Sequence, residues 1–422
     1  MAAPHNSGYL QATDPTKPRS DAAVPFRDII PPPSHPRIAG IADHNALSWC
    51  ESRRMIEAPA WLINRLDAKN LETPYIGFTS DGKVRTGLYH YAEDEGAPTE
   101  QVIAKAVHLL SLLPSDQKGA VQFGQVTDDA FRLWSNPELY MNPGGLRLDE
   151  CSEGIQTAVH TIFKASFSPQ GYEKVLGCCL TNGFLGHLVN GKKVLNEHSY
   201  NFRLFGTPSL SSPWGYTFFG HHLCLAVVFL GKRMVIGPTF MGAEPDRIDE
   251  GPHAGLRLFR TEELVSLKLM QGLPKELQDK ATLSKGMDGN SLAADRWNPF
   301  DERHLGGARQ DNRVLPYGIY FWYILRPPLT RYTEGCLVSE FPPASQDSII
   351  NLFLAFNEYY PESVLQHRLA LFKKHLNETY FAWIGEFGDE DPYYYRIHSP
   401  VAFMELDFHC GSKSYNSLFA YL

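Results

Sequence analysis

Two runs of residues with a strong strand preference most restrict what this chain can fold into. The first, near 215–240, holds two apolar segments on either side of Gly231-Lys232, and a leading glycine suits a two-residue hairpin turn of type II′. The second, 393–409, is aromatic and β-branched and is interrupted only at Pro400. With helical segments around them, these runs predict an α+β fold: helices packed on a mainly antiparallel sheet that includes a hairpin near 215–240 and a late strand near 393–409.

Apolar residues at spacings of three and four predict helices in much of the remaining chain. Val102, Ala106 and Leu109 lie on one face of a segment that Pro114 ends. Ser168-Pro169 is typical of a helix start, with serine as the N-cap and proline at the first helical position. The same pattern predicts helices over 101–113, 153–167, 261–273, 275–283, 346–359 and 362–375, one from Pro169 onward, and a surface loop over 288–314.

The domain organisation follows from composition. The first 37 residues contain eight prolines and few large apolar groups, which predicts a disordered arm over 1–37. We expect an N-terminal extension over 38–95, a single α+β domain over 96–411, and an atypical short tail over 412–422. No internal repeat is visible in the sequence.

Charge and cysteine content exclude several classes of function. The formal charge is -8 and no Lys/Arg run offers a footprint for a phosphate backbone, so nucleic acid is not an expected partner. The longest apolar stretch, 223–230, is far too short to span a bilayer, and the N-terminus lacks the apolar core of a signal peptide. Seven scattered cysteines, an odd number, are typical of reduced thiols in the cytoplasm.

Common catalytic signatures are missing. The chain has no glycine-rich phosphate loop and no dinucleotide fingerprint, so no nucleotide cofactor is expected. It also has no His-Glu-x-x-His motif and no Gly-x-Ser-x-Gly elbow. These absences disfavour nucleotide-driven chemistry and the familiar zinc-protease and serine-hydrolase mechanisms.

The first group that can carry chemistry is the pair His221-His222, which we expect at the opening of the hairpin. Neighbouring residues on a strand point to opposite faces, so both imidazoles reach one ligand only if the strand bulges, which Gly220 would permit. One histidine then serves as a metal ligand or proton carrier. The structural alternative is two core or edge histidines whose ring nitrogens are hydrogen-bonded.

The second group lies on the late strand, where Glu405, Asp407 and His409 share the face opposite an apolar one. Alternate residues of a strand are about 6.7 Å apart, so one ion can take Asp407 with His409, or Glu405 with Asp407. The alternative is a solvated polar face, or carboxylates paired with Arg396.

The chain also shows an ordered series of motifs that resembles a known family over residues 100–411. It is the family catalogued as a domain of unknown function and numbered thirty-five hundred, and the similarity is greatest to its fungal branch. The resemblance implies a shared fold and pocket but no named reaction. The motifs are Trp134-Ser135-Asn136-Pro137-Glu138, Gly145-Leu146-Arg147-Leu148, 168–172, 200–209, Pro213-Trp214-Gly215, Gly220-His221-His222, 238–245, 381–385, 394–400 and Glu405-Leu406-Asp407.

The chain departs from that family at its C-terminus. Members continue past the position of Gly411 with a His-x-His pair, an Arg and a late Asp-Tyr-Gly. This chain has eleven residues after Gly411, and their sequence contains none of these motifs. If that pair joins His221 or His222 and the 405–409 face in the family, the resemblance implies that part of the site is absent here, through a truncated gene end or a natural variant.

The leading hypothesis is a small-molecule enzyme, assisted by a divalent metal ion, in fungal specialised-metabolite or toxin biosynthesis. The alternatives are a non-catalytic small-molecule-binding or pathway-accessory protein, and a structural module with an exposed apolar patch. The oligomeric state is left open. For the enzyme, the expected catalytic residues are His221, His222, Glu405 and Asp407; the expected substrate-binding residues are Trp214, Glu244, Arg396 and Trp383; the expected metal ligands are His222, Asp407 and His409.

Overall fold

The computed structural model describes most of the chain between Phe26 and Tyr421. The predicted loop 288–314 and the predicted ligand His409 lie outside the described residues, as does most of the N-terminal arm. The described ranges are 26–30, 32–36, 38–56, 85–89, 94–132, 138–140, 143–285, 335–389, 391–408 and 416–421.

The helices confirm the periodicity of the sequence. Ser168 caps α8 as predicted, because its hydroxyl oxygen accepts a hydrogen bond from the Gly171 N–H at 2.9 Å. The helices are α1 (Phe26–Ile29), α2 (Ala46–Arg53), α4 (Thr99–Leu112), α5 (Ser115–Val121), α6 (Asp129–Arg132), α7 (Glu153–Ser166), α8 (Pro169–Leu188), α9 (Arg260–Gly272), α10 (Lys275–Ala281), α13 (Pro343–Phe356) and α14 (Glu362–Lys374). Short 3-10 turns are η1 (Ile41–Asp43), η3 (Leu148–Glu150), η6 (Val338–Glu340) and η7 (Leu376–Glu378).

The strands form one 12-stranded sheet, in which β1–β3 and β7–β9 are parallel and the other pairs are antiparallel. Its main path runs β1-β3-β4-β5-β6-β12-β11-β10-β9-β7, with β2 on β3 and β8 on β9. The α+β class and the mainly antiparallel sheet are therefore confirmed. The strands are β1 (Gln122–Phe123), β2 (Leu146–Arg147), β3 (Tyr200–Phe205), β4 (Trp214–Gly220), β5 (Leu223–Leu230), β6 (Arg233–Ala243), β7 (Thr282–Ser284), β8 (Cys336–Leu337), β9 (Tyr380–Gly385), β10 (Tyr393–His398), β11 (Phe403–Phe408) and β12 (Asn416–Tyr421).

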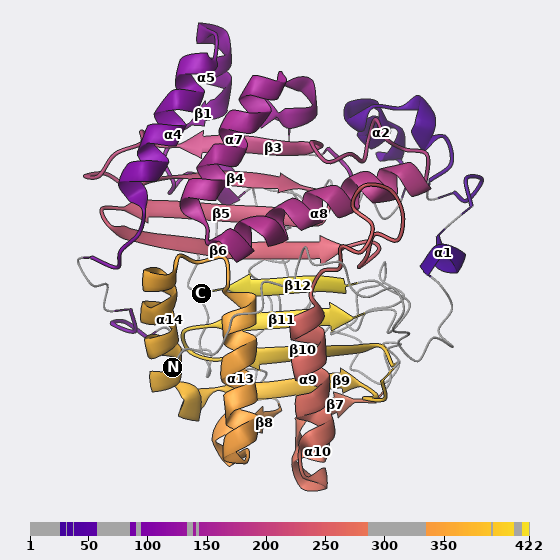
Figure 1. Cartoon of the computed structure of the whole chain (residues 1–422), viewed down its shortest axis with the longest axis vertical. Coiled ribbons are helices and arrows are strands. Elements are labelled where there is room, and N and C mark those ends of the chain that lie inside the picture. Colours follow the sequence, from indigo (N-terminus) through magenta and orange to yellow (C-terminus); the bar gives the residue numbers. More distant parts are fainter. Residues whose placement is uncertain are drawn as a thin grey trace.

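The long helices cover one face of this sheet. Helices α4, α7 and α8 lie over the half formed by β3–β6, and α9, α13 and α14 lie over the half formed by β9–β12 (Figure 1). Phe163 of α7 packs on Phe218 of β4 with ring centroids 4.7 Å apart, and the Tyr395 hydroxyl of β10 donates to the Glu262 carbonyl of α9. Alternate strand residues thus point into the helical layer, and the others point to the opposite face.

Both β-rich runs form hairpins. Gly231 has φ 59° and joins β5 to β6, as predicted. The late run is divided in two, because Pro400 has no N–H to donate and the chain turns there, where the Ser399 N–H donates to the Ala402 carbonyl at 2.8 Å. Strands β10 and β11 therefore lie side by side, with Arg396 opposite Glu405.

From Thr99 onward the described residues form two similar units, so the sequence-based expectation of no internal repeat is wrong. Apart from α6 in the first unit and η7 in the second, each unit has a helix, a short helix, an edge strand, a short strand, a 3-10 turn, two helices and four strands in this order. The strand order reads the same from both edges of the sheet. The sequence trace of this repeat is sparse, with Leu113-Pro114 matched by Leu273-Pro274 and Gly145 by Gly335. Strands β6 and β12 pair where the units meet.

Two predicted boundaries need correction. The segment expected to be a separate tail contributes β12, which lies between β6 and β11 inside the sheet. The end of the expected disordered arm is packed, since Phe26 is buried against Phe184 and Arg27 pairs with Asp249 at 2.7 Å. An aromatic ring and an ion pair thus fix residues that the proline-rich composition assigned to the arm.

Within the described ranges, no helix combines the length and the apolar character that crossing a bilayer requires.

The close contact of α8 with the end of α13 generates a stability prediction. A Cβ on Gly171 would lie 2.2 Å from the Tyr359 Cα, whereas one on Gly119 of α5 would meet nothing within 4 Å. We expect Gly171→Ala to lower the free energy of unfolding by about 2 kcal/mol through overpacking. Gly119→Ala should raise it by up to about 1 kcal/mol through helix propensity. Urea denaturation checks both, and a Gly171→Ala protein as stable as wild type would contradict the packing described.

Candidate metal centre

His221 and His222 form the two-residue turn between β4 and β5, since Gly220 and Leu223 are paired. They were expected on a strand, where both rings could reach one ligand only if the strand bulged. That placement is wrong, because the chain reverses direction at these two residues and no bulge is needed. His222 has φ 56°, a conformation that few residues other than glycine adopt. The two rings lie together, with centroids 3.8 Å apart and planes inclined by 37°.

Gly242 of β6 makes room for this arrangement. Its N–H donates to the His222 carbonyl at 2.7 Å, and a Cβ on Gly242 would come within 3.1 Å of the His222 side chain. His222 therefore lies over Gly242, with its ring 6.1 Å from that of Phe240. Two residues after Gly242, just past the end of β6, Glu244 meets both histidines.

One carboxylate oxygen joins the three side chains. The His222 Nε2–H donates to Glu244 Oε2 at 2.9 Å, and His221 Nε2 lies 3.6 Å from the same oxygen. The side chains of His221, His222 and Glu244 are 6%, 20% and 12% exposed, so the group is largely shielded from water without being sealed. Sequence reasoning placed Glu244 in the substrate pocket and did not join it to the histidines.

The 2.9 Å separation is that of two ligands on one metal ion, and the 3.6 Å separation is slightly wider. Two ligand atoms that are each about 2.0–2.1 Å from one ion lie about 2.9–3.4 Å apart at right-angle to tetrahedral spacing. One atom from each of the three residues lies within 4.8 Å of the others, and this is the one such group of His, Cys, Asp or Glu found in the described ranges. Two imidazoles and a carboxylate suit Zn²⁺ and several other first-row divalent ions.

Asn182 of α8 fixes which nitrogen of His221 carries the proton. The Asn182 Nδ2 group donates to the Asn196 carbonyl at 2.8 Å and to Ser199 Oγ at 2.9 Å. A carbonyl only accepts, so the amide nitrogen must face Asn196, and Oδ1 must face His221 Nδ1 at 2.9 Å. His221 therefore donates through Nδ1–H.

The consequence is a lone pair on the other nitrogen. In neutral His221 the proton on Nδ1 leaves Nε2 unprotonated, and Nε2 is the atom that faces Glu244. A histidine that binds a metal usually donates its second N–H to a fixed acceptor, which sets both the tautomer and the ring orientation. Here Oδ1 of Asn182 is the fixed acceptor.

The acidic strand lies nearby but outside this group. Ser417 of β12 is opposite both Gly242 and Asp407, so one strand separates Asp407 from the position beneath His222. Glu405 is 1% exposed and accepts a hydrogen bond from the Tyr394 hydroxyl, and Arg396 is its cross-strand neighbour. The predicted set of His222 with Asp407 is thus replaced by His222 with His221 and Glu244, and His409 lies outside the described residues.

The two predicted substrate-binding tryptophans belong to the core. Trp214 is fully buried at the opposite end of β4 from the histidine turn and stacks on Phe229 at 4.9 Å. Trp383 is fully buried on the helical face and stacks on Tyr393 at 4.4 Å. Both rings point into the helical layer, so neither lines the histidine site.

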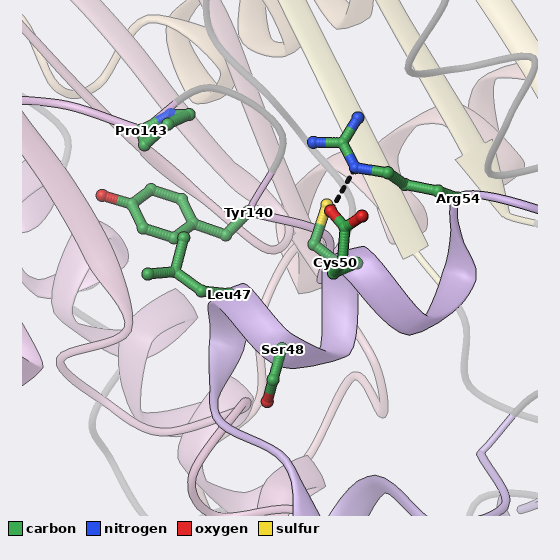
Figure 2. A pocket seen from close by; sticks show the side chains of 7 residues that line it. Leu47, Ser48, Cys50, Arg54, Tyr140 and Pro143 are labelled. Carbon is green, nitrogen blue, oxygen red and sulfur yellow. Dashed lines mark hydrogen bonds and ion pairs between the residues drawn. The ribbon is translucent and has the colours of Figure 1, made fainter.

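A cleft lies beside His221, and a larger pocket shares Tyr140 with it. The cleft has a volume of about 10 Å³, room for about one water molecule, and is lined by polar groups that include Arg147, Ser199 and Asn201. Tyr140 borders both this cleft and a pocket of about 320 Å³. In Figure 2, Leu47, Tyr140 and Pro143 gather at one end of that pocket and Arg54, paired with Glu51, lies at the other.

The cysteines do not offer a nucleophile to this site. The six in the described ranges are free thiols, as predicted for reduced cysteines. Burial raises the pKa of Cys178 to about 12 and that of Cys336 to about 11. Because the thiolate is the reactive form, these groups stay unreactive near neutral pH.

A family model described as "Protein of unknown function (DUF3500)" matches residues 95–418. The chain belongs to this family. The match confirms the resemblance that the motifs indicated and includes both units, the histidine turn and Glu244. No curated protein and no solved structure matches the chain. In this DUF3500 protein the site must therefore be interpreted from its own geometry.

The tautomer assignment for His221 is testable without metal. In chelated, ¹⁵N-labelled protein, two-bond ¹H–¹⁵N spectra should show the proton of neutral His221 on Nδ1. Asn182→Asp, which keeps an acceptor, should preserve this pattern, whereas Asn182→Leu should allow the Nε2–H form. Thr181→Val is the control, because the buried Thr181 hydroxyl makes no hydrogen bond to the described residues. A spectrum of wild type with the proton on Nε2 would contradict the assignment.

Proposed function

We propose that this protein is a metal-assisted enzyme that acts on a small molecule, with His221, His222 and Glu244 as the ligands of a divalent ion. The observation that carries the proposal is the convergence of two imidazoles on one carboxylate oxygen, at 2.9 and 3.6 Å. Three protein ligands leave coordination positions for water or substrate, which is the arrangement of catalytic rather than structural metal sites.

The surroundings favour a metal centre over a hydrogen-bonded cluster that only stabilises the turn. Such a cluster would need one acceptor for one histidine, whereas here a second imidazole directs its Nε2 at the same carboxylate, and in neutral His221 that nitrogen is unprotonated. His222 also holds a backbone conformation that is uncommon for its residue type, and conformations of this kind concentrate at functional sites.

The chemistry of the surroundings supports a small-molecule substrate. The site is largely buried beside a one-water cleft, and a pocket of about 320 Å³, close to the usual lower size for ligands, shares Tyr140 with that cleft. The formal charge of -8 disfavours a nucleic-acid substrate. A role in fungal specialised-metabolite or toxin biosynthesis, in the cytoplasm, remains part of the proposal and rests on sequence alone.

Metal analysis tests the proposal. Protein purified without added metal, or reconstituted with Zn²⁺, Fe²⁺ or Mn²⁺ after chelation, should hold about one ion per chain by elemental analysis. His222→Ala and Glu244→Gln should weaken retention at least tenfold while circular dichroism shows a folded protein. His187→Ala is a matched control, because His187 is exposed on α8.

The outcomes separate the hypotheses. Wild-type protein that takes up none of these ions would end the metal proposal, and a metal-free protein that still binds a small molecule would support a non-catalytic binding role. Because ligand imidazoles must be unprotonated, metal affinity should fall as the solution is made more acidic. Affinity that is constant down to pH 5 would exclude histidine ligands.

A further inference from the structure

The central hairpins of the two units correspond residue by residue, so each hairpin can be compared with the other. Hairpin β4–β5 pairs Trp214 with Phe229 and ends in the turn His221-His222. Hairpin β10–β11 pairs Tyr393 with Phe408 and ends in the turn Pro400-Val401, closed by the hydrogen bond from Ser399 to Ala402. The two hairpins have the same length, so their positions align without a gap.

The neighbouring strands confirm this alignment. Phe202 of β3 is opposite Leu146, and Phe381 of β9 is opposite Cys336. Gly206 and Gly385 both have positive φ, and a Cβ on either would collide with the carbonyl oxygen of the proline before the next strand. The correspondence thus extends over the sheet of both units.

The hairpins differ on the face that points away from the helices. Residues directly opposite each other on antiparallel strands share a face, so cross-strand pairs can be compared. The first unit has Thr217 with Ala226 and Gly215 with Val228. At the corresponding positions the second unit has Arg396 with Glu405 and Tyr394 with Asp407. Hairpin β4–β5 therefore carries no charge on this face, where the charge of the first unit is Arg203 on the neighbouring strand β3. Hairpin β10–β11 carries three charged side chains there, one basic and two acidic.

These three groups are buried, with Arg396 2%, Glu405 1% and Asp407 7% exposed. Removing ionised groups from water costs free energy that their mutual attraction often fails to exceed, and apolar residues in their place are often as stabilising or more so. The first unit builds the same hairpin without them. The fold as such therefore does not require these charges, and a function must account for them.

Their position indicates that function. Ser417 is paired with both Gly242 and Asp407, and adjacent strands are about 4.8 Å apart, so the backbones of Gly242 and Asp407 are about 10 Å apart. His222 lies over Gly242. The histidine turn of the first unit and the charged pairs of the second thus flank β12 at the junction of the units.

We propose that Arg396, Glu405 and Asp407 form the substrate-facing side of the active site, contributed by the second unit opposite the metal centre of the first. This inference rests on the proposed function. The ligand is a charged small molecule: the guanidinium suits an anionic oxygen of the substrate, and the carboxylates suit its amino or hydroxyl groups.

Exchange of residues between the units tests this proposal. The forward variant combines Arg396→Thr, Glu405→Ala and Asp407→Val, which introduce the residues of the first unit, with Tyr394→Phe. The last change removes the hydroxyl that donates to Glu405, so no buried donor is left without its acceptor. We expect its urea midpoint to equal or exceed that of wild type, because burying these charges costs more free energy than their mutual attraction provides. The reverse control, Ala226→Glu, should lower the midpoint. Both measurements are made on chelated protein, so they do not depend on metal.

A second measurement on the forward variant separates substrate-facing residues from ligands. Zn²⁺ alone, titrated into each protein, should bind the forward variant with the affinity of wild type. A forward variant that is clearly less stable than wild type would assign the charges a structural role and overturn the proposal. A tenfold loss of Zn²⁺ affinity would place the carboxylates at the metal and overturn it as well. Wild-type protein that binds no Zn²⁺ would defeat the metal proposal. The stability comparison is made without metal, so it would still decide whether the three charges have a structural role.

Discussion

The pairing of β6 with β12 is the interaction on which the rest of the structure depends. Five residue pairs, from Asn416–Ala243 to Ala420–Thr239, join the two units into one sheet. Without this pairing, each unit would expose a strand edge, and the two halves of the helical layer would have no common support. The same pairing brings the histidine turn and the charged hairpin onto one side of the molecule.

Much of the fold could be predicted from the sequence, because local patterns determine local elements. The helical periodicity of 101–113, the Ser168-Pro169 start and the Gly231 turn all appear as predicted. The internal repeat could not be seen, because the units share positions rather than residue types. Two features recur. One is a glycine whose Cβ would collide with the backbone of the neighbouring strand, as at Gly145 and Gly335, and the other is a helix that ends in leucine-proline.

The site was predicted in part. His221, His222 and Glu244 were each selected, but the register that joins them was not worked out. Counting back from the Gly231 turn places Phe240 opposite Leu223, and an irregularity between Leu225 and Val227 moves the observed partner to Met241. The hairpin thus brings Glu244 near the histidine turn, but the sequence did not show the irregularity that sets the final register. Asn182 had no sequence signal, since it lies on a helix and reaches His221 only through tertiary packing. Trp214 and Trp383 were assigned to the pocket, but both belong to the core. An aromatic residue near a motif can line a pocket or fill a core, and the sequence alone does not distinguish these two roles.

The sheet order also bears on how the chain folds. β6 precedes its neighbour β12 in the chain by the whole length of the second unit. During synthesis, the edge of β6 that pairs with β12 therefore has no partner strand until residues 416–421 have left the ribosome. The exposed N–H and C=O groups of such an edge can pair with a strand of another chain as well as with β12. The first unit therefore has an extended vulnerable period, and chaperone dependence and co-translational aggregation are expected to track the time taken to translate the second unit.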